Sequence, residues 1–179
     1  TRTALVVVDV QEAFRPAVLD FEQVARNVAT LVRGARILGL PTLVTEQYPK
    51  GLGPTVPEVK EALAEGPEPP ASILAKTSFS SYACEGVAAE IERRRARSVL
   101  VCGIETHVCV NQTVIDLLAN GVDVHVAEDA VASRSKRNWR LGLEKVERAG
   151  ATLSSVETAL FELVGRAGTD EFKAVLLDP

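Results

Sequence analysis

The stretch SVLVCGIETHVCVNQTVIDLL, Ser98–Leu118, decides the fold because its pattern changes from that of a strand to that of a helix. Residues 98–102 form a short apolar run rich in β-branched side chains, which is typical of a strand buried on both faces. Residues 103–107 interrupt it, and from Cys109 onward apolar side chains recur at three- and four-residue steps, the period of a helix. The sequence therefore predicts a strand, a tight turn and a helix, with Cys109 in the first helical turn.

The position of Cys109 at the start of a helix has a chemical consequence. Unpaired N–H groups and the positive end of the helix dipole stabilise an anion, so a thiol there can have a lowered pKa and react as the thiolate. The same N–H groups can bind the oxyanion that forms when a thiolate attacks a carbonyl. The alternative is that Cys109 is a small buried residue that begins an ordinary strand–helix unit.

The rest of the chain repeats the alternation of strand and helix. Strands are expected at 5–8, 41–45, 73–75, 98–102, 122–127 and 151–156, and further helices at 21–38, 58–64, 83–95, 134–148, 157–164 and 170–177. Such alternation predicts a parallel sheet covered by helices on both faces. We expect an α/β fold, a Rossmann-like three-layer sandwich with a mostly parallel sheet of about six strands, in a single domain over residues 1–179.

The composition is that of an ordinary globular protein. Hydrophobic residues make up 46% of the chain and charged residues 25%, and 24 acidic against 20 basic residues give a net charge of −4. This balance gives no electrostatic case for binding nucleic acid or an anionic membrane. The one basic run, at 93–97, ends a predicted helix, where cations complement the helix dipole.

Cysteine and histidine usage favours a cytoplasmic protein without a metal or other cofactor. The three cysteines form no C-x-x-C pair and no disulfide framework, which favours a reducing compartment. The chain enters a predicted strand at once, without a signal-peptide pattern, and no apolar run approaches the roughly 18 residues of a membrane span. The two histidines, His107 and His125, belong to no zinc-binding pattern.

Three reactive side chains, Asp9, Lys76 and Cys109, each come just after a different predicted strand. The carboxyl ends of parallel strands lie at one edge of the sheet, where ligands bind, so the three side chains can converge. The lysine can stabilise a thiolate by its charge, and the aspartate can take the thiol proton and return it to a leaving group. Each residue alone also has an ordinary explanation; Asp9, for example, could be a turn or cap residue.

Three motifs carry a resemblance to a known family. They are LVVVDVQ at 5–11, AKTSFS at 75–80 and CGIETHVCV at 102–110, and in this order they resemble the isochorismatase-like cysteine hydrolases. The segments VTEQYPKGLGPTVPE at 44–58, VHVAEDAVASRS at 124–135 and the FK…DP tail at 172–179 are most similar to one subgroup, the isochorismatase domain-containing proteins.

The resemblance implies a site and an activity. It implies a catalytic triad of Asp9, Lys76 and Cys109, a cis peptide bond between Ile104 and Glu105, and an oxyanion hole formed by the backbone N–H groups of Glu105 and Cys109. Amidases of this family attack an amide carbonyl with the thiolate, release ammonia or an amine, and hydrolyse the thioester with water. The family is typically oligomeric, so a homo-oligomer, a dimer or higher, is expected beside a small-molecule substrate.

Two departures from the family pattern narrow the activity. Metal-binding nicotinamidases carry an aspartate and histidines after the second strand, where this chain has Glu46, Gln47 and Tyr48, which argues against zinc and nicotinamide. Isochorismatase itself cleaves a vinyl ether and lacks the nucleophilic cysteine. We therefore expect a metal-independent hydrolase that cleaves the C–N bond of a small amide through a thioester at Cys109. The alternatives are a non-catalytic ligand-binding or interaction protein on the same fold, and the vinyl ether reaction.

Four further residues follow the same strand ends and are candidates to line the substrate pocket: Gln11, Phe14, Tyr48 and Phe79. Ordinary core packing is the alternative for the two phenylalanines. His107 is either a bystander on the turn or a contact to the substrate, and the sequence assigns no role to the Glu105 side chain.

Two other features have open interpretations. The proline- and glycine-rich stretch 46–72 is either a binding loop or a surface excursion. Trp139, the single tryptophan, lies among polar residues of a predicted helix and is a candidate for a subunit contact.

Overall fold

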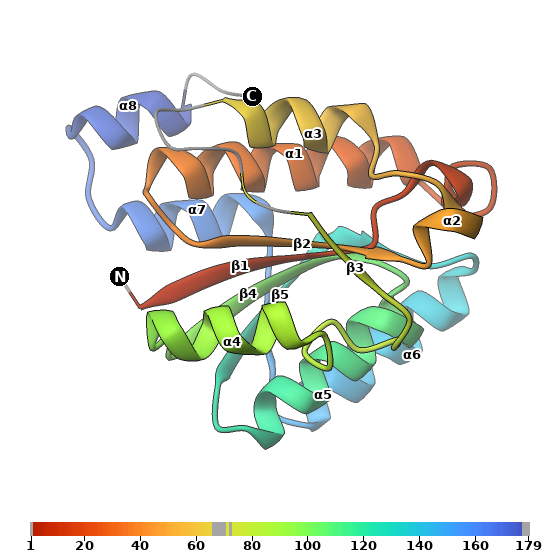
Figure 1. Cartoon of the computed structure of the whole chain (residues 1–179). Helices are drawn as coiled ribbons and strands as arrows, with labels where there is room; N and C mark the ends of the chain where they lie inside the picture. Colours follow the sequence, from red (N-terminus) through yellow and green to blue (C-terminus); the bar gives the residue numbers. More distant parts are fainter. Residues whose placement is uncertain (1, 66–70, 72, 177–179) are drawn as a thin grey trace.

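The computed structural model, which describes residues 2–65, 71 and 73–176, has six parallel strands in one sheet, in the order β3-β2-β1-β4-β5-β6 (Figure 1). The strands are β1 (Thr3–Val8), β2 (Thr42–Gln47), β3 (Ile73–Lys76), β4 (Ser98–Ile104), β5 (Asp123–Ala132) and β6 (Thr152–Ser154). The predicted α/β fold and its parallel sheet are confirmed.

Helices cover both faces of the sheet (Figure 1). On one face lie α1 (Phe21–Ile37), α3 (Pro57–Ala64), α7 (Val156–Val164) and α8 (Asp170–Leu176). On the other lie α4 (Glu85–Arg94), α5 (Asn111–Ala119) and α6 (Lys136–Arg148). The short helix α2 (Pro49–Leu52) follows β2.

The central strand β1 supplies side chains to both helical layers. Leu5 and Val7 belong to the apolar core under α1, and Val6 and Val8 belong to the core under α4 and α5. All four are at most 1% exposed. Because successive side chains of a strand point to opposite faces, a strand covered on both sides must be apolar at every position. This explains the continuous apolar run at the start of the chain.

The connections make β1 and β4 the switch point of the sheet. From β1 the chain passes through α1 to β2 and β3 on one side, and then through α4 to β4 on the other side of β1. In such sheets the crevice between the two strands where the order reverses is the usual ligand site. Asp9, after β1, and the turn after β4 both lie at this crevice.

The structure differs from the sequence-based expectation in three places. Strand β5 continues five residues past the expected end at 127, beyond a register shift in its pairing with β4. A π-helical turn, Thr106–Val110, precedes α5, so Cys109 lies in this turn. The stretch 46–72 contains the expected helix at 58–64 as α3 and, in addition, the short helix α2, which was not expected. Its residues 66–70 and 72 lie outside the described residues, as does the end of the tail at 177–179.

The close approach of β4 to β1 gives a prediction. Gly103 has a φ of +113°, and a Cβ there would lie 2.1 Å from the carbonyl oxygen of Val8. We predict that Gly103→Ala lowers the free energy of unfolding by about 4 kcal/mol, because a clash with backbone cannot be relieved by rotating a side chain. Urea denaturation measures the loss.

Gly39→Ala is the matched control, since Gly39 also has a positive φ, +65°, but no atom within 4 Å of the added Cβ. Its expected cost is only about 1 kcal/mol, the backbone penalty alone. Equal losses in the two variants would contradict the proposed clash.

Candidate active site

A buried ion pair joins the ends of β1 and β3. Lys76 Nζ lies 2.7 Å from Asp9 Oδ2, and the two side chains are 1% and 0% exposed. Nζ also lies 2.6 Å from Gln47 Oε1 and 3.0 Å from the carbonyl oxygens of Ser78 and Phe79. The ammonium group therefore has a full set of acceptors, which a buried charge requires.

The Asp9 carboxylate is held from a second side by β2. Thr45 Oγ1 donates to Asp9 Oδ1 at 2.8 Å and also lies 2.9 Å from Ser81 Oγ. Burial raises the pKa of Asp9, while the charge and hydrogen bond of Lys76 act in the opposite direction. A carboxylate with a raised pKa is a better proton acceptor than an exposed one.

Cys109 lies against this ion pair. Cys109 is 6% exposed, and its thiol and the Asp9 carboxyl group lie close enough for each to shift the pKa of the other. Thr113 Oγ1 donates to the carbonyl oxygen of Cys109 at 2.7 Å and accepts from the N–H of Ser81 at 2.8 Å, which ties the turn to the loop after Lys76. The structure thus brings Asp9, Lys76 and Cys109 together.

The expectation that the Cys109 pKa is lowered is wrong for the protein in this state. Burial, and after it the negative charge of Asp9, raise the pKa of the Cys109 thiol to about 12, and the opposing charge of Lys76 does not offset them. A helix start can stabilise a thiolate only where other effects are small, and here desolvation and a neighbouring anion are larger. At neutral pH the thiol keeps its proton beside the carboxylate that can remove it.

The turn that carries Cys109 has an unusual backbone. The peptide bond between Ile104 and Glu105 is cis. The carbonyl oxygen of Glu105 accepts from the N–H groups of Val108 and Val110 at 3.0 and 3.2 Å. The second bond spans five residues, the spacing of a π helix. The Glu105 side chain is 5% exposed and lies close enough to act electrostatically on the Cys109 thiol.

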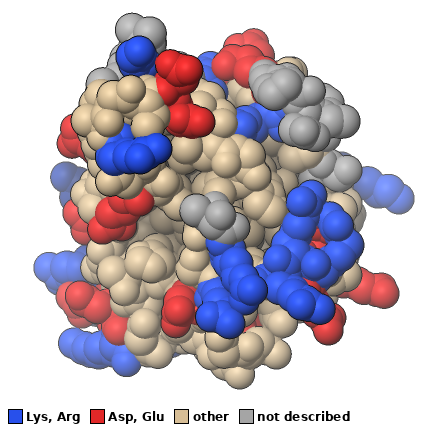
Figure 2. Space-filling model, turned by 90° about the vertical axis from the view of Figure 1, so that its left-hand side faces the viewer, with Lys and Arg blue, Asp and Glu red and all other residues tan. Residues whose placement is uncertain are grey.

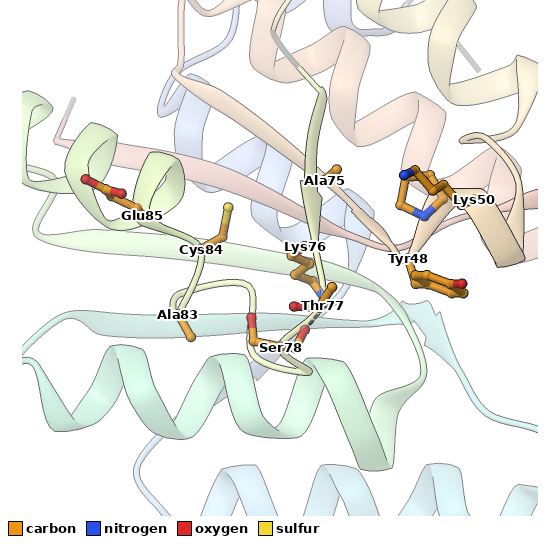
Figure 3. A pocket seen from close by; sticks show the side chains of 10 residues that line it. Tyr48, Lys50, Ala75, Lys76, Thr77, Ser78, Ala83, Cys84 and Glu85 are labelled. Carbon is orange, nitrogen blue, oxygen red and sulfur yellow. Dashed lines mark hydrogen bonds between the residues drawn. The ribbon is translucent and has the colours of Figure 1, made fainter.

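A pocket of about 580 Å³ opens beside Lys76 (Figure 3). Residues after β2, including Tyr48 and Lys50, lie on one side of it, and residues 83–85 lie on the other. Asp9 and Cys109 are not among the residues that line it, so Lys76 is the group shared by the pocket and the ion pair. Of the four predicted pocket residues, Tyr48 lines this pocket, and its ring is exposed.

The other three predicted pocket residues are placed differently. Gln11 is fully buried. Its side-chain Nε2 donates to the carbonyl oxygens of Gln47 at 3.0 Å and Gly53 at 2.7 Å, and its Oε1 accepts from the N–H of Gln47 at 2.8 Å. These hydrogen bonds fix the loop after β2. Phe14 packs against the apolar core. Phe79 is 53% exposed, and its carbonyl oxygen accepts a hydrogen bond from Lys76 Nζ.

The sequence analysis did not identify Thr45 and Gln47, two residues of β2 that bind the charged groups of Asp9 and Lys76. Their spacing could have indicated this role, because residues two positions apart in a strand point to the same face of the sheet. Parallel pairing then places them next to the residues that end β1 and β3, since Val8 pairs with Thr45 and Lys76 with Gln47.

The polar side chains of Glu46 and Gln47 at the end of β2 make hydrogen bonds within the protein. Glu46 Oε1 accepts from the N–H and Oγ1 of Thr55 at 2.6 and 2.8 Å, and Gln47 Nε2 donates to the carbonyl oxygen of Thr77 at 2.9 Å. Within the described part of the chain, no three His, Cys, Asp or Glu side chains are grouped so that they could hold a metal ion. In that same part, no helix is long and apolar enough to cross a membrane.

Comparison with known proteins shows the family to which this chain belongs. The isochorismatase domain family matches residues 3–158, so the chain belongs to this family of hydrolases. Isochorismatase domain-containing protein 2 of Bos taurus is 43% identical over 96% of this chain and 79% of its own length. The secreted isochorismatase effector Isc1 of Phytophthora sojae is 41% identical over 97% of this chain and 82% of its own length. Because one relative is secreted, the compartment of this protein stays a prediction.

Solved structures agree with the family assignment. MAR1 ribonuclease from Caenorhabditis elegans has a TM-score of 0.90 and 42% identity, covering 98% of this chain and 88% of its own. YcaC from Pseudomonas aeruginosa, solved with hexane-2,5-diol and covalent acrylamide, has a TM-score of 0.86 and 26% identity over 98% of this chain and 88% of its own. Escherichia coli YcaC, described as an octameric hydrolase of unknown specificity, is 22% identical and shares the fold, with a TM-score of 0.86 over 98% of this chain and 87% of its own.

The ion pair leads to a stability prediction. We expect Lys76→Met to lower the free energy of unfolding by about 3–5 kcal/mol, because it leaves the buried Asp9 carboxylate without its cation. Adding Asp9→Asn to this variant should restore part of the loss. Urea denaturation of the two variants measures both effects. Lys145→Met changes an exposed lysine of α6 and should stay within about 0.5 kcal/mol of wild type; an equal loss there would argue against the role of the pair.

The raised thiol pKa leads to a labelling prediction. Asp9→Asn removes the anion that raises the pKa of Cys109, so the pH profile of its reaction with methyl methanethiosulfonate should shift to lower pH. Peptide mapping assigns the label. Half-buried Cys84 serves as the internal control and should react at the same rate in both proteins. An unchanged pH profile of Cys109 labelling in the variant would show that Asp9 does not raise its pKa.

Proposed function

We propose that this protein is a metal-independent cysteine hydrolase that cleaves the C–N bond of a small amide through a thioester at Cys109. The observation that carries the proposal is the electrostatic interaction of a buried thiol with a buried, lysine-paired carboxylate. Such a pair can move one proton between sulfur, leaving group and water without exposing a net charge. The catalytic residues of this proposal are Asp9, Lys76 and Cys109.

In the first half of the reaction, the thiol sulfur attacks the amide carbonyl carbon while Asp9 accepts the thiol proton. The C–S bond forms, and the carbonyl electron pair moves onto oxygen, where the backbone N–H groups of Glu105 and Cys109 would bind the oxyanion. Lys76 keeps Asp9 ionised before attack and offsets the charge that develops on sulfur. Asp9 then gives its proton to the nitrogen, the C–N bond breaks, and ammonia or an amine leaves.

In the second half, water attacks the thioester carbonyl and Asp9 takes a proton from it. Collapse of the intermediate breaks the C–S bond, and the sulfur regains the proton. The net change is amide plus water to carboxylic acid plus ammonia or amine. A high thiol pKa in the resting protein is compatible with this sequence, because the proton leaves only as the C–S bond forms.

The covalent acrylamide in the solved structure of Pseudomonas aeruginosa YcaC supports a primary amide as the kind of small molecule that this fold admits. A pocket beside Lys76 is available for the remainder of the substrate. The substrate itself and a homo-oligomeric state belong to the proposal.

The solved relative described as a ribonuclease raises nucleic acid as an alternative substrate. The basic side chains visible in Figure 2 lie on the side of the molecule where α4 ends and β4 begins. Two of the arginines at the end of α4, Arg93 and Arg94, are paired with Glu90. This side is the edge opposite to the strand ends that carry Asp9 and Cys109, so a polyanion bound there would not reach the thiol. The amide reaction is favoured for this reason.

The test is ammonia or amine release from a panel of small primary and N-substituted amides, followed with a coupled assay. Cys109→Ala, Asp9→Asn and Lys76→Met should each lower turnover at least about a thousandfold, since members of a catalytic unit fail together. Asp170→Asn and Lys145→Met, on exposed helix positions, should leave turnover unchanged.

The outcomes separate the alternatives. Turnover retained in all three site variants would overturn the triad. Hydrolysis of a vinyl ether that survives Cys109→Ala would assign the protein to the isochorismatase reaction instead. Cleavage of RNA that survives the same change would place a second chemistry elsewhere on the chain. No turnover of any substrate by the wild type would favour a binding protein on a hydrolase fold.

A further inference from the structure

Four buried side-chain atoms in the described part of the chain have no hydrogen-bond partner, and all belong to two segments near Cys109. They are Ser80 Oγ, Glu105 Oε2, Thr106 Oγ1 and Asn111 Nδ2. Glu105 is the charged member of this set. A buried carboxylate oxygen without a donor is costly, so a further polar group is expected to complete it.

The two oxygens of Glu105 have different surroundings. Oε1 lies 2.6 Å from Nε of Arg134, whose side chain is 62% exposed, while the Glu105 side chain is 5% exposed. Oε2 lies 3.4 Å from Nδ1 of His107, a ring that is charged only when it is protonated. One oxygen is therefore held by a surface cation, and the other is left as a buried acceptor.

The hydrogen bonds of His107 exclude it as the missing donor. Its Nε2 faces the amide nitrogen of Asn138 at 3.2 Å, and because that nitrogen can only donate, Nε2 accepts. The ring hydrogen is then on Nδ1, which lies 3.0 Å from Ser133 Oγ and donates to it. His107 therefore has no hydrogen left for Glu105 Oε2.

Glu105 is also the residue whose backbone N–H belongs to the proposed oxyanion hole. The Glu105 carboxylate acts electrostatically on the Cys109 thiol, so the nitrogen of an amide held at that thiol, two bonds from its carbonyl oxygen, would lie near this carboxylate. We propose that Glu105 determines substrate class by accepting a hydrogen bond from an N–H of the scissile amide. Arg134 holds the carboxylate in place. The substrates are then amides that carry N–H, while esters and N,N-disubstituted amides are disfavoured.

This inference rests on the proposed function. The experiment that tests the inference measures recognition of the amide group separately from hydrolysis. Acrylamide, N,N-dimethylacrylamide and methyl acrylate share one electrophile: the Cys109 sulfur bonds to the β-carbon, and the thiol proton ends on the α-carbon. Acrylamide alone offers N–H. The rate of adduct formation at Cys109, from intact mass and peptide mapping, is divided by the rate of each reagent with glutathione to remove intrinsic reactivity.

We expect the normalised rate for acrylamide to exceed that for the other two reagents about tenfold in the wild type, as a hydrogen bond to a buried carboxylate implies. Glu105→Gln keeps the shape of the side chain but replaces the charged acceptor with a weaker neutral one, so the preference should fall to a few-fold. Glu144→Gln changes a carboxylate on α6 with 43% exposure and should keep the full preference.

Equal normalised rates for the three reagents on the wild type would overturn the inference, and this arm needs no variant to fold. An unchanged preference in Glu105→Gln, or parallel losses for all three reagents, would show that Glu105 only supports the turn. A wild type that prefers acrylamide but hydrolyses no amide contradicts the proposed function alone. Amide hydrolysis without the preference contradicts this inference alone.

Discussion

The buried contact between Asp9 and Lys76 is the constraint on which the rest of the site depends. An ion pair with 0% and 1% side-chain exposure is stable only if each remaining donor and acceptor is satisfied, and these come from Gln47, Thr45 and two backbone carbonyls. These partners belong to the end of β2 and the loop after β3, and the two charged residues themselves lie at the ends of β1 and β3. Satisfying two charges therefore fixes the relative positions of the strand ends at the switch point of the sheet.

The same pair sets the electrostatics around the thiol. Lysine and aspartate together add no net charge, so a protonated Cys109 keeps the resting site neutral although it is cut off from water. An isolated thiolate would face the cost of burial and the repulsion of Asp9 and Glu105, which is the reason its pKa lies at about 12 rather than below its usual value. Reactivity in such a site comes from the geometry of proton transfer rather than from a standing thiolate.

Much of the fold and of the candidate site could be predicted from the sequence. The features that could not be predicted share one physical cause. The apolar run at 5–8, the strand–turn–helix pattern at 98–118 and the alternation between them were sufficient for a parallel sheet, and a parallel sheet brings Asp9, Lys76 and Cys109 to one edge. Distances and burial were not accessible in this way. The direction of the Cys109 pKa depends on how deeply the thiol is buried, and the role of Gln11 depends on which backbone groups lie within 3 Å of its amide. The longer β5 and the π turn depend likewise on tertiary packing.

The buried amide of Gln11 has a consequence for how this protein can change. It bonds to the backbone at both ends of the stretch 47–53, and the N–H of Tyr48 bonds to the carbonyl of Lys76. Between these ends, Tyr48, Pro49 and Lys50 line the pocket. The side chains of Tyr48 and Lys50 are exposed, so they can be replaced without disturbing the ion pair beneath. The lining of the pocket can therefore change while the stability of the fold stays nearly constant.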